Sequence, residues 1–483
     1  MRPTSFSRMS DSTSPPTTIS KSTEHFDLVI VGTGSANSII SSDFDSWRVA
    51  IVENDVFGGT CLNRGCIPTK MFVHAADVAE TVRHAHELGV DASIDGIRWR
   101  DIRDRVFNRI DPIAEGGEDY RTNRCPNVTV IKGTGRFIGE RTIAVTSPSG
   151  GQRTIIGDQV VVAVGARPHQ PDTDGLHRVP YHTSDSIMRI DEVPKHLAIL
   201  GGGFIANELA HVFGSFGSRI TLIHRSGALL REQEAEIATR FTELVRARPN
   251  FDVRLNTTAT RVRHDGNFVR LDLSDGSMVT ADALLVATGR IPNSDTVHAS
   301  AGGMEITAGG RIVVDQHQHT TAPGVWALGD VSSPHMLKHV ANHEARVVQQ
   351  NLLATRSGGE MRSVNHDFVP AAVFTRPQLA AVGLTEAQAR AAGHDVMVKT
   401  QNFGDTAYGW AMEDTSSICK LVADRKTRLL LGAHLLGPHS SILIQQLIQG
   451  MAFGQTVDEM AHNQYFIHPA MPEVVENALL GLA

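Results

Sequence analysis

The sequence is poor in cysteine, in aromatic residues and in net charge. Four cysteines among 483 residues are too few for the disulfide framework of a secreted protein, so we expect a reducing, cytoplasmic compartment. The 45 lysines and arginines are outnumbered by 52 aspartates and glutamates, and the net charge of -7 argues against a nucleic-acid-binding surface. No apolar run reaches the roughly eighteen residues that span a bilayer. These absences favour a soluble protein. Its length corresponds to about two to four domains.

Residues 1–24 lack the apolar segment of a signal peptide and are rich in serine, threonine and proline. We expect a disordered N-terminal extension there. A transit peptide is the alternative because the segment has few acids, although it shows no amphipathic arginine pattern. Met9 is an alternative start.

The first ordered stretch has the pattern of a dinucleotide-binding fold. An apolar, β-branched run at 26–31 predicts a buried strand, and Gly32 and Gly34 follow it. Such glycines permit a tight turn and let a diphosphate approach the backbone at the N-terminus of a following helix. The next strand ends at Glu53, where an acid would hydrogen-bond a ribose hydroxyl. The third fingerprint position is Asn37 rather than Gly or Ala, so the motif is imperfect.

Two cysteines, Cys61 and Cys66, lie just after this fold, among Gly58, Gly59 and Gly65. Five residues along an early helix or helical turn can bring two Cα atoms within disulfide range, under about 7 Å. Two unrelated thiols and a metal pair are the alternatives, but no second Cys or His pair stands nearby at zinc-ligand spacing. A dithiol placed after a dinucleotide fold can exchange electrons with a bound redox ring. We therefore predict a redox-active disulfide.

A second dinucleotide fingerprint follows an apolar strand at 196–200. It is complete, with Gly201, Gly203 and Ala206 in the three positions. The next strand ends not in an acid but in His224-Arg225, with Arg231 slightly further on. Arginine can pair with a 2′-phosphate, which a carboxylate would repel, so NADPH is favoured over NADH. If the two arginines are merely solvated, either nicotinamide remains open.

Three further strands end in residues that suit a nucleotide site. The strands at 160–167 and 282–290 each contain a late glycine and end in arginine, which suggests that the chain crosses between domains there. The strand near 320–330 ends in Gly329-Asp330, where the carboxylate could bind a ribityl hydroxyl of a flavin. His335, His339 and His343 would stack on one helix face, but no acid or cysteine completes a metal site, so we predict none.

From Phe368 onward the composition changes to alternating apolar strands followed by an apolar helix at 442–453, which predicts an α+β domain. Near its end, His468 and Glu473 could form an imidazole oriented by a carboxylate, as a general acid–base needs. A structural histidine is the alternative.

These motifs together resemble the FAD-dependent pyridine nucleotide–disulfide oxidoreductases, the group of glutathione reductase and dihydrolipoamide dehydrogenase, from about residue 26 to the C-terminus. Within the group the chain is most similar to the mycothione reductases, on residues 32–35, 111–114, 181–185, 337–346, 407–414 and 468–470. The resemblance implies an α/β fold of two Rossmann-like domains, for FAD and NADPH, plus a C-terminal α+β dimerisation domain. The implied boundaries are 25–168 and 296–366 for FAD, 169–295 for NADPH and 367–483 for dimerisation.

The resemblance also assigns roles. Cys66 would contact the flavin and Cys61 would attack the substrate disulfide, while His468, held by Glu473, would act on it from the other subunit of a homodimer. Lys70 and Glu208 match a buried ion pair beside the flavin, since a lone buried lysine is costly. Phe204 matches an aromatic gate on the nicotinamide side. The FAD residues would be Gly32, Gly34, Ser35, Glu53, Gly59, Thr60, Lys70, Gly165 and Asp330; those for NADPH would be Gly201, Gly203, Phe204, Ile205, Glu208, Arg225, Arg231 and Gly289.

Two residues depart from the family pattern. Asn37 replaces a glycine, which would reshape packing beneath FAD without preventing its binding. Arg64 stands between the cysteines where the family has a small apolar residue. A cation there should favour thiolate and make the disulfide more oxidising.

Three functions follow in order of preference. The resemblance implies mycothione as the disulfide substrate. The alternative is a dihydrolipoamide dehydrogenase, which would use NAD and dock into a large acyl-transfer complex; the missing acid at Arg225 weighs against it. A nucleotide-binding scaffold without dithiol chemistry is disfavoured by Cys61, Cys66, His468 and Glu473. Tyr408 and Trp410 are equally compatible with sugar stacking and with a dimer interface.

Overall fold

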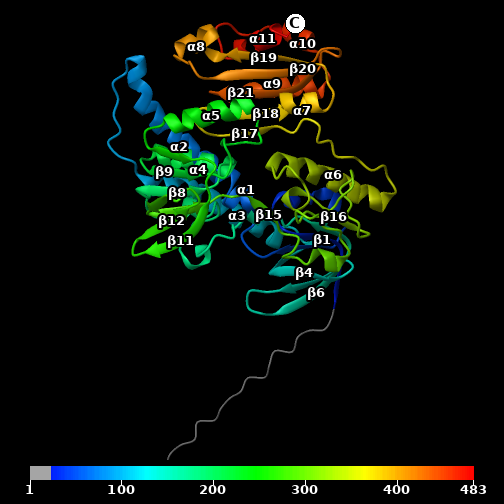
Figure 1. The fold of residues 1–483 in the computed structure, drawn as a ribbon. Helices are drawn as coiled ribbons and strands as arrows, with labels where there is room; N and C mark the ends of the chain where they lie inside the picture. Colours follow the sequence, from blue (N-terminus) through cyan, green and yellow to red (C-terminus); the bar gives the residue numbers. More distant parts are fainter. Residues whose placement is uncertain (1–22, 483) are drawn as a thin grey trace, which may run out of the picture.

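The first sheet draws its strands from two separate stretches of the sequence (Figure 1). This computed structural model describes residues 23–482, so nearly all of the extension expected at 1–24 lies outside the described residues. The strand order is β3-β2-β1-β6-β5-β4, and β16 also pairs with β6. Five strands run parallel, and β4 and β5 add an antiparallel hairpin. The bounds are β1 Glu24–Val31, β2 Val49–Glu53, β3 Val128–Lys132, β4 Thr134–Gly139, β5 Thr142–Thr146, β6 Gln152–Val162 and β16 Val325–Ala327.

The helix expected after Gly34 is absent from the described chain, and that prediction is wrong. Two short 3-10 turns, η1 (Ser35–Ser38) and η2 (Ser42–Phe44), fill the connection to β2. The segment is short and rich in Ser and Asp, whose side chains compete with helical hydrogen bonds. A long helix from the later stretch, α6 (Lys338–Ser357), packs beside η1 and shares its apolar core.

The dithiol region forms a helical layer next to this sheet. It comprises α1 (Gly59–Asn63), α2 (Cys66–His84), η3 (Ala85–Leu88) and α3 (Trp99–Asn123). Phe72 of α2 stacks on Trp99 with ring centroids 5.0 Å apart. The same apolar core includes Phe213 of the second dinucleotide fold, so the helical layer packs against the helices of that fold.

The second dinucleotide fold has a parallel sheet in the order β10-β9-β8-β14. Helices α4 and α5 pack in one apolar core with this sheet, and an antiparallel sheet, β11-β12-β13, packs in another. Its elements are β8 His196–Leu200, α4 Phe204–Ser215, β9 Arg219–Ile223, α5 Ala235–Ala247, β10 Phe251–Arg254, β11 Ala259–Asp265, β12 Phe268–Leu273, β13 Met278–Ala281 and β14 Ala283–Val286.

A short antiparallel ribbon links the two folds. β7 (Ala166–Pro168) pairs with β15 (Arg290–Pro292). These are the segments after the strands at 160–167 and 282–290, so the structure brings together the two points where the sequence indicated a crossing between domains.

The C-terminal part is one antiparallel sheet, β17-β18-β21-β20-β19, with helices packed on it. The strand β21 was not predicted, although it is the central one. Its elements are β17 Ala371–Val373, β18 Gln378–Gly383, α7 Glu386–Ala391, β19 Val396–Asn402, α8 Ala407–Ala411, β20 Ile418–Asp424, β21 Leu430–Gly437, α9 Ser440–Ala452, α10 Val457–His462 and α11 Glu473–Leu480.

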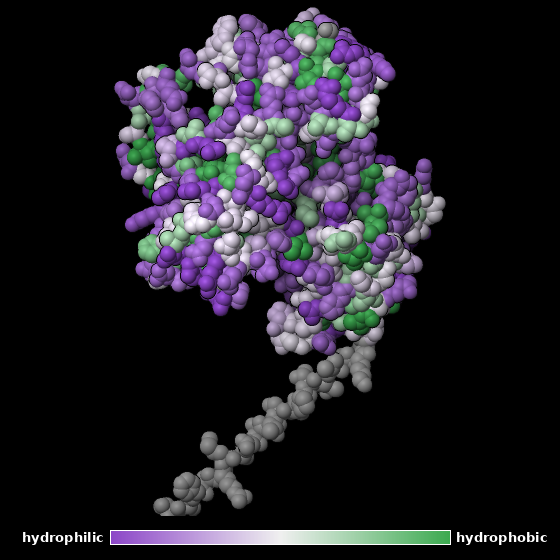
Figure 2. Space-filling view, in the orientation of Figure 1, coloured by the Kyte–Doolittle hydropathy of each residue, from purple (hydrophilic) through white to green (hydrophobic). Residues whose placement is uncertain are grey.

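The surface of this C-terminal part carries large apolar side chains. Figure 2 shows green groups among purple ones over it, at the top of the view. Exposed residues there include Trp410 (65%), Ile442 (69%), Phe453 (78%), Tyr465 (105%) and Ile467 (75%). Between residues 23 and 482, no helix is both long enough and apolar enough to cross a membrane.

Candidate functional site

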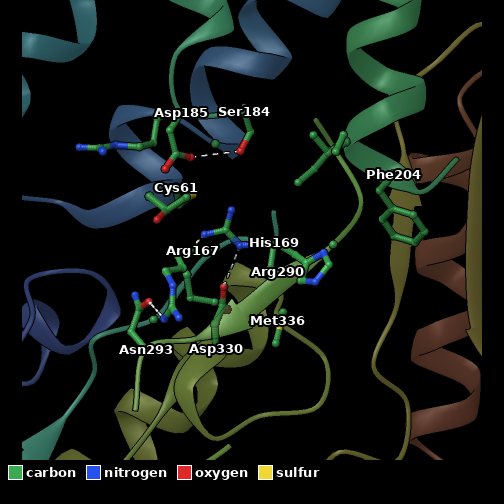
Figure 3. A pocket seen from close by; sticks show the side chains of 18 of the residues that line it. Cys61, Arg167, His169, Ser184, Asp185, Phe204, Arg290, Asn293, Asp330 and Met336 are labelled. Atoms are coloured by element: carbon green, nitrogen blue, oxygen red, sulfur yellow. Dashed lines mark hydrogen bonds and ion pairs between the residues drawn. The ribbon is translucent and has the colours of Figure 1, made fainter. Parts of the chain in front are cut away.

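One large cavity connects both glycine turns with the dithiol. Its volume is about 1380 Å³, and residues 32–35, 58–61 and 201–205 line it. Figure 3 shows Cys61 and Phe204 on opposite sides of this space. A single small-molecule site has about 300–1,000 Å³, so this cavity has room for two nucleotides.

The turn after β1 is open toward the cavity and closed behind it. Gly32 has φ +102°, and a Cβ there would lie 2.5 Å from the carbonyl oxygen of Ala163. A Cβ at Gly34 would meet no atom within 4 Å, whereas one at Gly59 would lie 2.8 Å from the Gly34 Cα. This backbone therefore fits the close approach of a dinucleotide diphosphate.

Two carboxylates flank this turn. Glu53 at the end of β2 accepts hydrogen bonds from the Thr33 backbone N–H at 2.9 Å and from the Thr33 hydroxyl at 2.5 Å, so it also fixes the turn. Asp330 lines the cavity beyond β16, with Arg290 at 3.9 Å (Figure 3). Burial raises the pKa of Asp330. Both acids are placed to meet sugar or ribityl hydroxyls.

The dithiol spans a break between two helices, not one continuous helical turn as the spacing had indicated. Cys61 lies in α1, and Cys66 is the first residue of α2. The break falls at Arg64 and Gly65, where a Cβ on Gly65 would lie 2.9 Å from the Thr60 carbonyl oxygen. Both thiols line the cavity, and each acts on the pKa of the other.

The two thiols differ in acidity. The hydrogen bond from Cys61 and the charge of Lys70 lower the pKa of Cys66 to about 7, against the effect of burial. The hydrogen bond to Cys66 and burial raise the pKa of Cys61, while Lys338 acts in the opposite direction. The first thiolate of the reduced pair therefore forms at Cys66.

Lys70 and Glu208 form an ion pair at the cavity wall. Lys70 Nζ, on α2, lies 2.7 Å from both carboxylate oxygens of Glu208 on α4. The Phe374 backbone N–H donates to Glu208 at 3.0 Å, and the Phe374 ring lies 4.6 Å from Nζ. The buried carboxylate of Glu208 thus has the cation that its burial requires, whereas the Lys70 side chain is half-buried and not fully buried as expected.

Arg64 has a partner outside the dithiol. Its guanidinium is ion-paired with Asp55. The cations that act on the thiols are Lys70 and Lys338. The carboxylate of Asp55 therefore offsets the charge of Arg64, which lessens the effect that this charge was expected to have on the disulfide.

Asn37 anchors α3 to the turn. The Arg121 guanidinium, which is buried, donates to the Asn37 side-chain oxygen at 3.0 Å and to its backbone carbonyl at 2.7 Å. The amide side chain thus has its own structural use at the position where a glycine was expected.

The turn after β8 opens the helix α4. Gly201 has φ +133°, and a Cβ there would lie 2.2 Å from the Ala287 carbonyl oxygen, while one at Gly203 would meet no atom within 4 Å. Phe204 and Ile205 begin α4 and line the cavity. This second turn combines an open backbone with a helix N-terminus, the arrangement that binds a diphosphate.

Arg225 and Arg231 are exposed at the cavity rim, after β9. Burial, Arg231 and Arg225 together lower the pKa of His224. Two cations on this loop, with no acid at the end of β9, fit a phosphorylated ribose.

Gly165 and Gly289 stand where the ribbon β7–β15 begins. They have φ +65° and +131°, and a Cβ on either would meet no atom within 4 Å. Both line the cavity, so these open backbones face its contents.

His468 and Glu473 form a pair outside the cavity. His468 Nδ1 lies 2.6 Å from a Glu473 carboxylate oxygen, and the Ala470 backbone N–H donates to the other oxygen at 3.2 Å. The side chain of His468 is 71% exposed. Neither residue lines the cavity that contains Cys61, so the structure does not bring the pair to the dithiol of its own chain.

The three histidines of the 335–343 run do not share a helix face. His335 precedes α6, and His339 bonds to the Pro370 carbonyl oxygen at 2.9 Å. Within the described part of the chain, no group of His, Cys, Asp and Glu is arranged to hold a metal ion.

Lys338 also lines the cavity, and no sequence motif predicted a role for it. Its Nζ donates to the Ser35 hydroxyl at 2.8 Å, and that hydroxyl donates to Asn342 at 3.0 Å. The two partners are about three hundred residues apart in sequence, so no local motif could reveal the contact.

Comparison with known proteins places the chain in a family. The family model of the pyridine nucleotide-disulphide oxidoreductases matches residues 26–345, and that of their dimerisation domain matches 369–479. Mycothione reductase of Mycobacterium tuberculosis (strain H37Rv) is 53% identical over 464 residues, covering 95% of this chain and 100% of that protein. The probable pyridine nucleotide-disulfide oxidoreductase RclA of Escherichia coli is 31% identical, covering 93% of this chain and 97% of that one. Mercuric reductase of Bacillus cereus is 31% identical, covering 90% and 68%.

Solved structures give the same result. The HOCl-induced flavoprotein disulfide reductase RclA from E. coli aligns with a TM-score of 0.82 and 31% identity, covering 94% of this chain and 99% of that one. The predicted fold class, two dinucleotide folds with a C-terminal dimerisation domain, is confirmed. The dihydrolipoamide dehydrogenase alternative is not supported. The chain belongs to the pyridine nucleotide–disulphide oxidoreductases, as a FAD-dependent flavoprotein disulfide reductase that takes its electrons from a nicotinamide nucleotide.

Proposed function

We propose that this enzyme uses NADPH to reduce mycothione to two molecules of mycothiol. The observation that carries the substrate is the 53% identity, over 100% of its length, to a protein named mycothione reductase. RclA of Escherichia coli and mercuric reductase of Bacillus cereus are each only 31% identical, so they carry less weight for the choice of substrate.

The cofactor sites are proposed from the residues that line the cavity. FAD would lie on the open turn at Gly32, Gly34 and Ser35, with Glu53 and Asp330 toward its hydroxyls. Gly59, Thr60, Lys70 and Gly165 complete its surroundings. NADPH would lie on Gly201, Gly203, Phe204, Ile205, Glu208 and Gly289, with its 2′-phosphate on Arg225 and Arg231.

FAD, when bound, supplies a ring that accepts hydride from the nicotinamide and returns two electrons to the Cys61–Cys66 disulfide. Lys70, fixed by Glu208, holds a positive charge beside Cys66 and favours its thiolate. Phe204, across the cavity from Cys61, would cover the nicotinamide side.

The Cys61 thiolate would attack one sulfur of mycothione. The substrate S–S bond breaks, a mixed disulfide forms on Cys61, and the first mycothiol leaves as a thiolate. Cys66 then attacks the Cys61 sulfur, which reforms the protein disulfide and releases the second mycothiol. His468 of the partner subunit would take the proton from Cys61 and give it to the first leaving thiolate. The raised pKa of Cys61 in a single chain is the reason that such a base is needed.

The domain organisation is part of the proposal. The FAD-binding part would comprise residues 25–168 and 296–366, the NADPH-binding part 169–295 and the interface part 367–483. The exposed apolar side chains of the last part would be covered in a homodimer, which would work in the cytoplasm.

Anaerobic titration of the purified yellow protein tests this function. Two-electron reduction by NADPH should produce a long-wavelength thiolate-to-flavin band, NADH should produce it less readily, and mycothione but not lipoamide should remove it. If lipoamide removes the band and mycothione does not, the substrate is wrong. If no band forms, the proposed dithiol–flavin contact is wrong.

A further inference from the structure

The first dinucleotide turn lacks a source of positive charge that such turns normally have. A helix N-terminus behind the glycines usually presents free N–H groups and about half a positive charge to the diphosphate. Here the residues after Gly34 form the four-residue 3-10 turn η1, which is too short for that effect. A diphosphate on this turn therefore needs another cation.

Lys338 contacts the first dinucleotide turn, although it lies much later in the sequence. It is the first residue of α6, it lines the cavity, and its Nζ donates to the Ser35 hydroxyl at 2.8 Å. The Ser35 hydroxyl in turn donates to Asn342 at 3.0 Å, one turn further along α6. Ser35 is thus oriented by α6, with its oxygen lone pairs toward the ammonium.

The charge of Lys338 has no counterion at ion-pair distance among residues 23–482. Asp330 is the acid whose pKa it influences, against the dominant effect of burial, and Asp330 has Arg290 as its own neighbour. A half-buried ammonium that faces a cavity is stabilised when an anion enters that cavity.

We propose that Lys338 binds the diphosphate of FAD and replaces the missing helix of the first turn. The oriented Ser35 hydroxyl and the open backbone at Gly34 complete this site. The inference depends on FAD binding, which the family establishes, and not on the identity of the disulfide substrate.

Release of FAD from the purified holoenzyme tests the proposal. Flavin fluorescence rises when FAD leaves the protein, so it reports the release rate after dilution and the release temperature on heating. Lys338→Met should release FAD about tenfold faster or more and at a lower temperature, since it loses a charge-assisted contact to phosphate. Lys338→Arg should stay within a few-fold of the wild type. Added salt should accelerate release from the wild type more than from Lys338→Met.

Lys195→Met is the matched control because Lys195 is an exposed lysine that does not line the cavity. Ser35→Ala is a second variant, which keeps Lys338 and should give a smaller increase in release rate. Circular dichroism establishes that each variant is folded; if Lys338→Met does not fold, Lys338→Gln takes its place. The proposal is overturned if the folded, charge-free variant releases FAD at the wild-type rate. It is also overturned if the release rate is unchanged and only the flavin absorbance shifts, because Lys338 would then act on the ring.

Discussion

At the scale of single residues, the acidity of the dithiol depends on which cation stands beside which sulfur. Lys70 lies near Cys66 and is held there by two short contacts to Glu208. Arg64 is next to both cysteines in sequence, yet its guanidinium is paired with Asp55. Of these two cations it is Lys70 that lowers the pKa of Cys66, in addition to the effect of the Cys61 thiol.

Lys70→Met should raise the pKa of Cys66, because the charge of Lys70 is one of the causes that lower it. The loss of a nearby opposite charge shifts a pKa by about one unit or more, and the sign is upward because the cation favours the thiolate. In a Cys61→Ser background, the pH dependence of thiolate absorbance measures Cys66 alone. At neutral pH the variant should hold more thiol than the parent.

Arg64→Val in the same background is the control for a cation near the sulfurs. We expect its titration midpoint to match the parent because Asp55 already neutralises Arg64. A midpoint that moves as far as that of Lys70→Met would contradict this reading of the ion pairs.

At the scale of elements, a buried lysine ties three segments together. Lys420 of β20 lies 2.8 Å from Glu234, which precedes α5, and 3.0 Å from Glu386 of α7. Its side chain is 7% exposed. Burial opposes ionisation of Glu234, but hydrogen bonds from Lys420 and from the Glu386 backbone N–H lower its pKa overall. The second dinucleotide fold is thereby fixed to the C-terminal domain.

Lys420→Met should lower the free energy of unfolding by about 3 kcal/mol or more, because it leaves the buried carboxylate of Glu234 without its cation. A carboxyl with a lowered folded pKa stabilises the fold above its unfolded value, near 4.5, and loses this contribution as the pH falls further. The difference from the wild type should therefore be large at neutral pH and shrink below about pH 4.5. Urea unfolding of both proteins at neutral pH and below pH 4.5 measures this difference in the free energy of unfolding. A difference that does not depend on pH would argue against the ionic cause.

The elements themselves show what the sequence could reveal. The strand β8 was predicted at its observed bounds because it is a short apolar run followed by a glycine turn. The helix expected after Gly34 from the dinucleotide fingerprint is replaced by 3-10 turns, because the local Ser and Asp side chains compete with helical hydrogen bonds. The cavity position of Lys338 and the pairing of Arg64 with Asp55 could not be predicted, since both depend on how separate elements pack.

At the scale of the whole molecule, one chain does not assemble the proposed site. The pair of His468 and Glu473 is exposed and away from the cavity with Cys61. The apolar surface of the same domain is also unburied. A two-fold dimer would cover that surface and could bring each histidine to the other chain's dithiol.

Mixed dimers test whether the histidine acts between chains. Cys61→Ser and His468→Ala should each be inactive, but refolding an equal mixture should restore about a quarter of the wild-type activity, because half of the dimers contain one intact site of two. Each variant refolded alone is the control. If the mixture remains inactive while mixed dimers are present, the histidine does not act on the partner's dithiol.

The pairing of β16 with β6 has a consequence for how the chain is made. Val325–Ala327 completes a sheet whose other strands lie before residue 163, and Trp326 is fully buried there. On the ribosome, the middle domain emerges entire before this strand does and can fold first. Until residue 327 has left the exit tunnel, one side of β6 therefore remains unpaired. This exposed edge can pair with strands of neighbouring nascent chains.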